Sequence, residues 1–216
     1  MIRNVIFIIL FVILYGGAYL LLDNSNNQTL TDRNEYGEFT GHTYNCNRFS
    51  VKMEYDEDWL VFDGVSMEQA LNATYSHKEI EGMYGSVIDS IKFVGGAVTP
   101  RAYILCAAVT GENVSESELN GTSMETTLSY MKEGITGQGG TMGDAICYSV
   151  DVKGTGNKMI VYGYDYTLNG EQYSNFSCIT NTGEDTLIFS GKYEDSEGLK
   201  QLTDFVENKL YFYSAA

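Results

Sequence analysis

FSVKMEYDEDW, residues 49–59, contains the clearest strand pattern in the chain and its only tryptophan. Four apolar residues alternate with polar ones along it: Phe49, Val51, Met53 and Tyr55. Alternation with a period of two is typical of a strand that buries one face. We therefore expect one strand over residues 43–55, interrupted by the acidic residues 56–58, within a domain built around a sheet.

The same stretch holds four carboxylates within residues 54–58, which suggests either a metal site or a turn facing water. Asp56 and Asp58 match two ligand positions of a calcium loop, but apolar residues occupy the positions that should follow. Glu54, Asp56 and Asp58 are therefore kept as candidate metal ligands, and a solvent-facing turn is the favoured interpretation. Under that interpretation, Trp59 is mostly buried.

Before the domain comes an uncharged run of 18 residues, residues 5–22. A helix needs about 20 residues to cross the hydrocarbon core of a bilayer. Arg3 precedes the run, which favours a cytoplasmic N-terminus and the rest of the chain outside. We expect residues 1–22 to form a single-pass membrane anchor. The alternative is a signal peptide cleaved near the small residues 16–18, followed by secretion.

Residues 23–41 are polar and are expected to form a linker, and residues 42–216 to form one extracytoplasmic domain. The 17 tyrosines and 10 phenylalanines favour strands. The formal charge is −16, from 29 acidic and 13 basic residues. Such a surface repels phosphate backbones and attracts cations and basic partners, so no nucleic-acid partner is expected.

Local patterns predict three helices. Capping boxes mark two of them, at residues 66–69 and 122–125, and Asp195 or Ser196 caps the third. Apolar stripes support the second helix (Met124, Leu128, Met131, Ile135) and the third (Leu199, Leu202, Val206, Leu210).

Further strands are expected over residues 87–94, 102–110, 144–152, 158–168, 171–180 and 186–193. A Gly-Gly…Pro turn over residues 95–100 separates the first two, and the second is apolar enough to be covered on both faces. Asn169 and Gly170 predict a type I′ hairpin turn. The fold class expected is α+β: a single antiparallel β-sheet flanked by helices, an α/β/α sandwich, behind an N-terminal transmembrane helix.

The chain has few of the parts that catalysis at neutral pH requires. Its two histidines, His42 and His77, belong to no nucleophile or metal-binding pattern. The glycine-rich residues 134–143 follow a predicted helix, whereas a phosphate-binding loop follows a strand. We therefore expect neither an enzyme nor a cofactor. The four cysteines are Cys46, Cys106, Cys147 and Cys178. They leave three disulfide pairings open, with buried free thiols as the alternative.

Three tyrosines alternate along one predicted strand and so share a face: Tyr162, Tyr164 and Tyr166. Such rings form a recognition surface for peptide or sugar in some proteins. In others they pack beneath a helix or against cross-strand neighbours. Both interpretations stay open.

FSVKMEYDEDW also resembles the opening strand of the PsbP-like superfamily, F-S-x-x-x-P-x-x-W. The stretch keeps Phe49, Ser50 and Trp59 of that pattern, but Trp59 lies two residues further along than the pattern places it, and no proline occurs in the stretch. LIFSGKY and LKQLTDFVENKLYF, residues 187–193 and 199–212, are similar to the closing strand and helix of that superfamily. The superfamily includes the extrinsic oxygen-evolving protein of photosystem II, a Ran-GTPase-binding nuclear protein and many exported bacterial proteins.

The resemblance covers residues 43–213. It implies an α/β/α sandwich around an antiparallel sheet, with roles in binding or assembly. We expect a non-catalytic accessory module of a bacterial cell envelope, held at the membrane by residues 5–22 and binding an unidentified protein partner. The alternatives are an envelope hydrolase that uses Glu54 or Asp56 with a distant partner, and a cation-dependent adhesion domain.

Overall fold

A computed structural model of the chain describes residues 37–66, 90–119 and 124–213. The strands within these residues are β1 (Glu38–Thr40), β2 (Thr43–Cys46), β3 (Val51–Glu54), β4 (Leu60–Asp63), β5 (Ile91–Val98), β6 (Ala102–Val109), β7 (Thr141–Asp151), β8 (Lys158–Leu168), β9 (Glu171–Thr182), β10 (Asp185–Tyr193) and β11 (Leu210–Phe212). The helical segments are α6 (Glu116–Leu119), α7 (Met124–Gly137), α8 (Ser196–Asp204) and the π-helical turn η3 (Phe205–Lys209).

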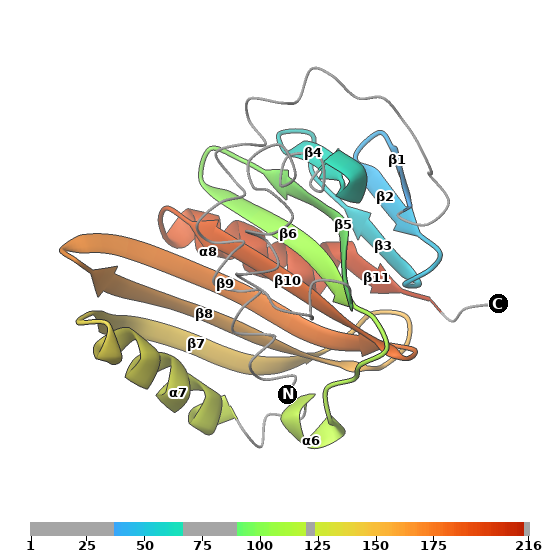
Figure 1. The fold of residues 1–216 in the computed structure, drawn as a ribbon. Coiled ribbons are helices and arrows are strands. Elements are labelled where there is room, and N and C mark those ends of the chain that lie inside the picture. Colours follow the sequence, from blue (N-terminus) through green and yellow to red (C-terminus); the bar gives the residue numbers. More distant parts are fainter. Residues whose placement is uncertain (1–36, 67–89, 120–123, 214–216) are drawn as a thin grey trace.

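The strands form two antiparallel sheets, so the α+β class is confirmed and the single sheet expected from the sequence is wrong (Figure 1). The larger sheet has the order β4-β5-β6-β10-β9-β8-β7. The smaller sheet has the order β1-β2-β3-β11 and therefore joins the first described strands to the last. Local sequence patterns do not reveal such a pairing, because Phe212 and its partner Val51 lie at opposite ends of the domain.

The strand expected over residues 43–55 is a hairpin. A tight turn over residues 47–50 separates β2 from β3, and the Ser50 N–H donates to the Asn47 carbonyl at 3.2 Å. Ser50 takes a left-handed φ of 51°, which reverses the chain in the middle of the pattern. The alternation itself is confirmed, since Phe49, Val51, Met53 and Tyr55 are all buried.

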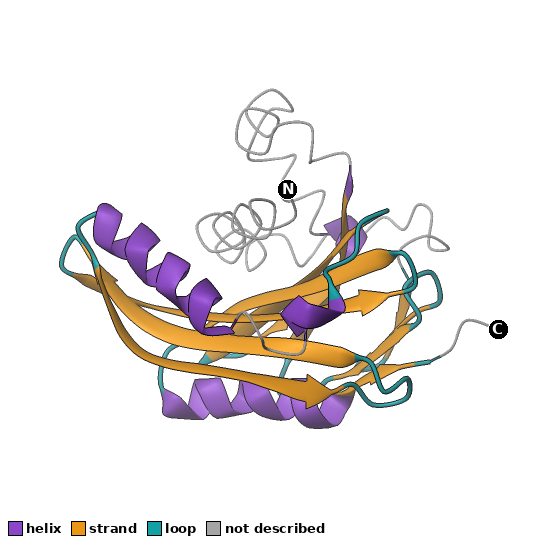
Figure 2. Ribbon diagram, turned by 90° about the horizontal axis from the view of Figure 1, so that it is seen from below, coloured by secondary structure: helices purple, strands orange, loops and turns teal. Residues whose placement is uncertain are grey.

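Helices lie on both faces of the larger sheet. In Figure 2, α8 runs along one face, and α7 and α6 lie on the opposite face. One hydrophobic cluster fills the space between the larger sheet, the smaller sheet and α8. A second cluster covers the face toward α7 and α6. Strand β6 is buried along almost its whole length, as its apolar sequence predicts.

The predicted turns and caps are only partly correct. Asn169 and Gly170 both have positive φ, at 54° and 84°, which confirms the type I′ turn. Gly95 and Gly96 lie inside β5, beside a bulge, and the turn comes after them, at residues 99–101. Asp63, not Ser66, caps the helical turn after β4, because its carboxylate accepts the Ser66 N–H at 2.8 Å.

Helix α7 carries the predicted stripe, with Met131 buried against the sheet. Helix α8 begins after Asp195, whose carboxylate accepts the N–H groups of Glu197 and Gly198. The third predicted helix ends earlier than its apolar stripe suggests. Its last residue, Leu210, begins β11, because η3 intervenes.

Several predictions from the sequence fall on residues outside the described ranges. They are the anchor at residues 1–22, most of the linker, the helix after Ser66, the first two residues of the capping box (Thr122 and Ser123), and His77. Strand β1 begins at Glu38, inside the range assigned to the linker. In the described ranges, no helix combines the length and apolar character needed to span a bilayer.

Candidate functional site

A cleft of about 150 Å³ lies between the acidic turn after β3 and the outer side of α8 and η3. The turn contributes Tyr55, Asp56 and Trp59. The helical segments contribute the other lining residues: Glu197, Lys200, Gln201, Asp204, Phe205 and Lys209. The stretch that gives the strand pattern in the sequence therefore forms one wall of the cleft.

Three aromatic rings form the base of this cleft. Tyr55 stacks on Phe205 with ring centroids 4.9 Å apart, and Trp59 lies 5.8 Å from Tyr55 and 6.2 Å from Phe205. Trp59 is 4% exposed, which confirms that it is mostly buried. Stacked and tilted rings at these distances pack favourably and fix the shape of the base.

Charged side chains form the rim. Lys209 makes an ion pair with Asp56 and a second with Asp204, where its Nζ lies 3.5 Å from the carboxylate. Burial lowers the pKa of Lys209, but the hydrogen bond and charge of Asp56, together with Asp204, outweigh this effect and raise the pKa. Lys209 is therefore a fixed positive charge at neutral pH, held between two carboxylates.

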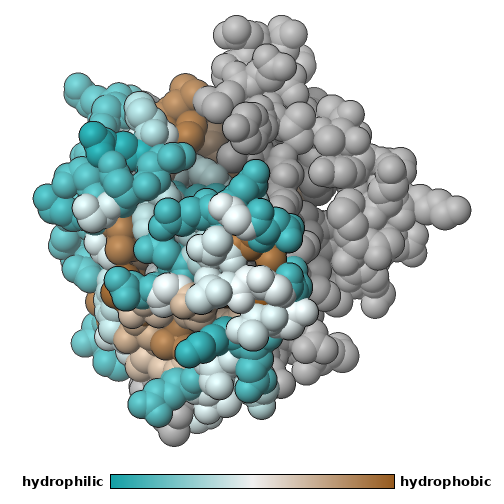
Figure 3. All heavy atoms as spheres, turned by 90° about the vertical axis from the view of Figure 1, so that its left-hand side faces the viewer, coloured by the Kyte–Doolittle hydropathy of each residue, from teal (hydrophilic) through white to brown (hydrophobic). Residues whose placement is uncertain are grey.

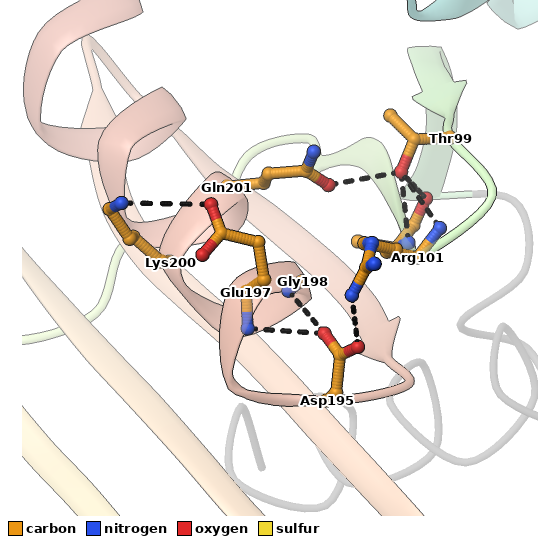
Figure 4. A network of polar contacts seen from close by, with 8 residues as sticks. Thr99, Arg101, Asp195, Glu197, Gly198, Lys200 and Gln201 are labelled. Atoms are coloured by element: carbon orange, nitrogen blue, oxygen red, sulfur yellow. Dashed lines mark hydrogen bonds and ion pairs between the residues drawn. The ribbon is translucent and has the colours of Figure 1, made fainter.

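The wall formed by α8 is held in place by polar contacts to the β5–β6 turn (Figure 4). Arg101 forms an ion pair with Asp195, the residue that caps α8. The Thr99 hydroxyl donates to Gln201 Oε1 at 3.1 Å. The first two turns of α8 are thus attached to the larger sheet, so the cleft has a rigid side.

The π-helical turn η3 contributes Phe205 and Lys209 to the cleft, and residues four apart are neighbours on a helix surface. An extra residue in the turn widens the helix, and such turns occur frequently at functional sites. Phe205 lies at its start with its ring in the core, and Lys209 lies at its end on the rim. Both residues, and Asp204, were missed in the sequence, because their place in the cleft depends on contacts with the distant residues Tyr55 and Asp56.

The residues proposed as metal ligands do not converge. Residues 56–58 are exposed, as a solvent-facing turn requires. Glu54 forms an ion pair with Lys52, and Asp56 forms one with Lys209. Across the described part of the chain, no three His, Cys, Asp or Glu side chains are grouped so that they could hold a metal ion.

The tyrosine face lies elsewhere. Tyr162, Tyr164 and Tyr166 belong to the hydrophobic cluster on the side of α7 and α6, and each is at most 8% exposed. Tyr166 stacks on Tyr173 with centroids 5.2 Å apart. Burial raises the pKa of Tyr164 to about 12. These rings therefore pack in a cluster and do not line the cleft.

All four cysteines are free thiols, and Cys46, Cys106 and Cys178 are buried. Cys106 and Cys178 lie on the two strands that flank Phe189, each paired directly with it. Burial raises the pKa of the Cys106 and Cys178 thiols well above the usual value. They behave as small apolar core residues.

No protein-family model matches the sequence, and no curated protein matches it. Solved structures do resemble the chain. Cyanobacterial PsbP (CyanoP) from Synechocystis sp. PCC 6803 is 10% identical, with a TM-score of 0.48 over 88% of this chain and 99% of that one.

Two further structures are similar. A protein from Bacteroides thetaiotaomicron VPI-5482 is 11% identical, with a TM-score of 0.42, and the match covers 76% of this chain and 46% of that one. LpqN, described as involved in cell envelope biogenesis of Mycobacterium tuberculosis, is 12% identical, with a TM-score of 0.41 over 93% of this chain and 98% of that one.

Proposed function

We propose that the protein is a non-catalytic binding module of the cell envelope, and that the cleft beside α8 receives a basic side chain from a partner protein. In this proposal residues 5–22 anchor the chain, and the domain faces outward. The observation that carries the proposal is the arrangement of three carboxylates, Asp56, Glu197 and Asp204, around an aromatic base.

Charge favours a cationic ligand. The cleft lining contains three acidic and two basic side chains, and the whole chain has a formal charge of −16. Hydrophilic residues cover most of the described surface on the side seen in Figure 3, with apolar residues in smaller patches. A negatively charged surface raises the local concentration of basic partners and speeds their association.

The chemistry of the lining favours arginine in particular. A guanidinium group stacks on aromatic rings and binds carboxylates through two parallel hydrogen bonds. Lys209 already holds Asp56 and Asp204, so an arriving guanidinium would share these carboxylates with it. The Glu197 carboxylate lies 3.6 Å from the ammonium of the exposed Lys200, and this weak contact leaves it more available to bind the guanidinium.

Trp59 fluorescence tests the proposal directly, because Trp59 is the only tryptophan. N-acetylarginine amide should change the emission of the full-length protein in nanodiscs, and the isosteric citrulline derivative should not. Glu197→Gln and Asp204→Asn should each weaken binding about fivefold, because each removes one charge contact. Glu207→Gln is the matched control, since Glu207 accepts a hydrogen bond from Tyr148 outside the cleft. Equal responses to arginine and citrulline would refute the proposal.

The proposed orientation has a separate test. Protease added to intact cells should digest the domain, because it lies outside the membrane. If digestion requires cell lysis, the domain is internal and the outward orientation is wrong.

A further inference from the structure

The larger sheet ends in one long edge. In the part of the chain that the structure describes, β7 is hydrogen-bonded to β8 on one side and to no strand on the other, and Figure 1 shows it as the outermost strand. We propose that this edge pairs with the same edge of a second copy of the chain, antiparallel and centred on Tyr148. The two larger sheets would then form one continuous sheet across a twofold axis. The proposal does not depend on the cleft or on its arginine ligand.

The length of β7 sets it apart from the other edge strands in the described ranges. Those strands are β1, β4 and β11, with three, four and three residues, whereas β7 has 11. A short edge limits pairing with other chains, because it presents few free N–H and C=O groups. None of the residues of β7 is buried, so the strand stays accessible to a partner. Such an edge is what binding by strand addition requires.

The middle of β7 lacks the features that protect long edges. Proteins block unwanted pairing with lysine, proline, charged side chains or bulges. β7 contains no lysine and no proline, and its bulge lies near its start, between Met142 and Ala145. The only charged residues of the strand are Asp144 and Asp151, and the stretch between them, AICYSV, is uncharged. This stretch is therefore open to pairing.

The sequence of that stretch indicates that the partner is a second copy. ICYSV is nearly symmetric about Tyr148. Antiparallel pairing centred on Tyr148 places Ile146 opposite Val150 of the other copy. It also places Cys147 opposite Ser149, two small side chains of similar shape. A twofold interface requires this kind of self-complementarity, because the same patch serves on both sides.

The matched residues also share faces of the sheet. Tyr148 and Val150 pack against the cluster toward α8. Cys147 packs against the cluster toward α7 and α6, and the Ser149 hydroxyl donates to the Leu119 carbonyl of α6 at 3.1 Å. A twofold axis perpendicular to the sheet keeps each face on its own side. Aliphatic and aromatic residues therefore meet on one face and small residues on the other, and such cross-strand pairs stabilise antiparallel strands.

Charge does not oppose this alignment. Asp151 lies opposite Ala145 of the other copy, and its carboxylate forms an ion pair with Lys158 of its own copy. Within residues 145–151, pairing therefore brings no two carboxylates face to face.

The paired stretch is short, so we expect a weak, reversible dimer. Residues 145–151 are far fewer than the roughly 20–30 residues that each side contributes to a standard stable interface. If the proposed anchor at residues 5–22 is correct, copies confined to one membrane would meet at a raised local concentration.

The first test is chemical cross-linking of the full-length protein. Position 148 lies on the twofold axis and faces its own copy, with Cβ atoms about 4.5–5.5 Å apart. Tyr148→Cys, in a chain that also carries Cys147→Ala, should therefore give dimers with a short bismaleimide. Asp144→Cys in the same background is the matched control and should give none, because the two copies of that residue lie roughly 25 Å apart.

Two outcomes of the cross-linking would overturn the proposal. One is a yield of dimer for Tyr148→Cys that is no higher than the yield for Asp144→Cys. The other is a cross-linked product of a different mass in whole cells, with no dimer, which would assign the edge to another protein.

The second test measures the dimer by sedimentation velocity of the full-length protein in detergent. Tyr148→Lys should weaken dimerisation about tenfold or more, because it places two like charges directly opposite each other. The monomer should stay folded, because the Tyr148 hydroxyl donates to Glu207 Oε1 at 2.9 Å and an ammonium group also suits that carboxylate. Tyr148→Phe is the matched control and should dimerise as the unmodified protein does.

Absence of a dimer at every protein concentration would overturn the proposal. A dimer that Tyr148→Lys leaves unchanged would also overturn it, because residues 5–22 or another surface would then hold the copies together. Failure of the arginine test would leave these results unaffected.

Discussion

Lys209 and Asp56 form an ion pair across the cleft, so the end of η3 is joined to the acidic turn after β3. The Lys209 side chain is 24% exposed, and the same ammonium also faces Asp204. One cation therefore holds two carboxylates that would otherwise repel each other. This contact connects segments from the two ends of the described chain.

Lys209→Met should lower the free energy of unfolding by about 0.5–1 kcal/mol, because it removes both ion pairs and leaves two like charges close together. Urea denaturation measures the change. Lys200→Met is the matched control, because the Lys200 side chain is 75% exposed and its contact to Glu197 is 3.6 Å long. Equal losses of stability for the two variants would contradict this prediction, because the Lys209 ion pairs would then stabilise the protein no more than the Lys200 contact does.

Trp59→Ala should lower the free energy of unfolding by about 3–5 kcal/mol, because it removes a large buried ring that packs beside the stacked Tyr55 and Phe205. Trp59→Phe should cost considerably less, because it keeps an aromatic ring at the position. Denaturation curves measure both changes. The tryptophan emission of the unmodified protein should also shift to longer wavelength on unfolding, and an emission already typical of exposed tryptophan would contradict the structure.

The sequence predicts the elements with strong local patterns. The Asn169–Gly170 turn, the stripe on α7, the Asp195 cap and the burial of Trp59 are all confirmed. The turn, the stripe and the cap depend on neighbours within a few residues, so local chemistry was enough to identify them. Trp59 also packs against the distant Phe205, and only its position directly after the strand and the acidic turn indicated its burial.

The features that the sequence did not reveal depend on distant contacts. Strand β11 is stabilised by pairing with β3, so Leu210 leaves the helical stripe in which it was predicted. The cleft joins the turn at Asp56 to Lys209, and no spacing within either segment indicates that they meet. The sequence did not predict the burial of Asn175 either, because an unpaired polar group can be recognised only when its neighbours in the fold are known.

Two glycines should respond in opposite directions when replaced by alanine. Gly170 has a φ of 84°, which strains a residue with a Cβ, so Gly170→Ala should destabilise the protein by about 1 kcal/mol. Gly134 lies within α7, and an added Cβ would meet no atom within 4 Å, so Gly134→Ala should stabilise by about 0.5–1 kcal/mol. Thermal unfolding of both variants measures the two changes in stability. Changes in the same direction would contradict the assigned backbone conformations.

Stability should fall as the solution becomes alkaline. Burial raises the pKa of Tyr164 to about 12, above the value near 10 of an exposed phenol. A raised pKa in the folded state stabilises the protein fully below about pH 10, and this contribution is lost as the pH rises toward about 12. Burial also raises the pKa of Tyr44 and Tyr103, so they act in the same direction.

Urea denaturation between about pH 8 and pH 11 measures this loss, and tyrosinate absorbance follows ionisation in the folded protein. Tyr164→Phe should lose less stability than the unmodified protein over the same interval. If all tyrosines ionise together near pH 10 while the protein stays folded, the buried position of Tyr164 is wrong.

Thiol labelling should distinguish the four cysteines. Cys147 is partly exposed, although burial raises its pKa to about 11, so it should react slowly, and faster as the pH rises. The three buried thiols should react only after unfolding. Mass spectrometry after labelling of native and unfolded protein counts the modified residues. Cys147→Ala should abolish native labelling, and fewer than four labels on the unfolded, unreduced protein would reveal a disulfide.

The pairing of β11 with β3 also sets an order of events in folding. As the chain is synthesised from its N-terminus, β1, β2 and β3 emerge early, but their sheet lacks its fourth strand until Leu210–Phe212 arrive. Closing such a long loop is slow, because its entropy cost must be met before the contact forms. The smaller sheet should therefore remain incomplete until Leu210–Phe212 are released, and their pairing with β3 should complete it.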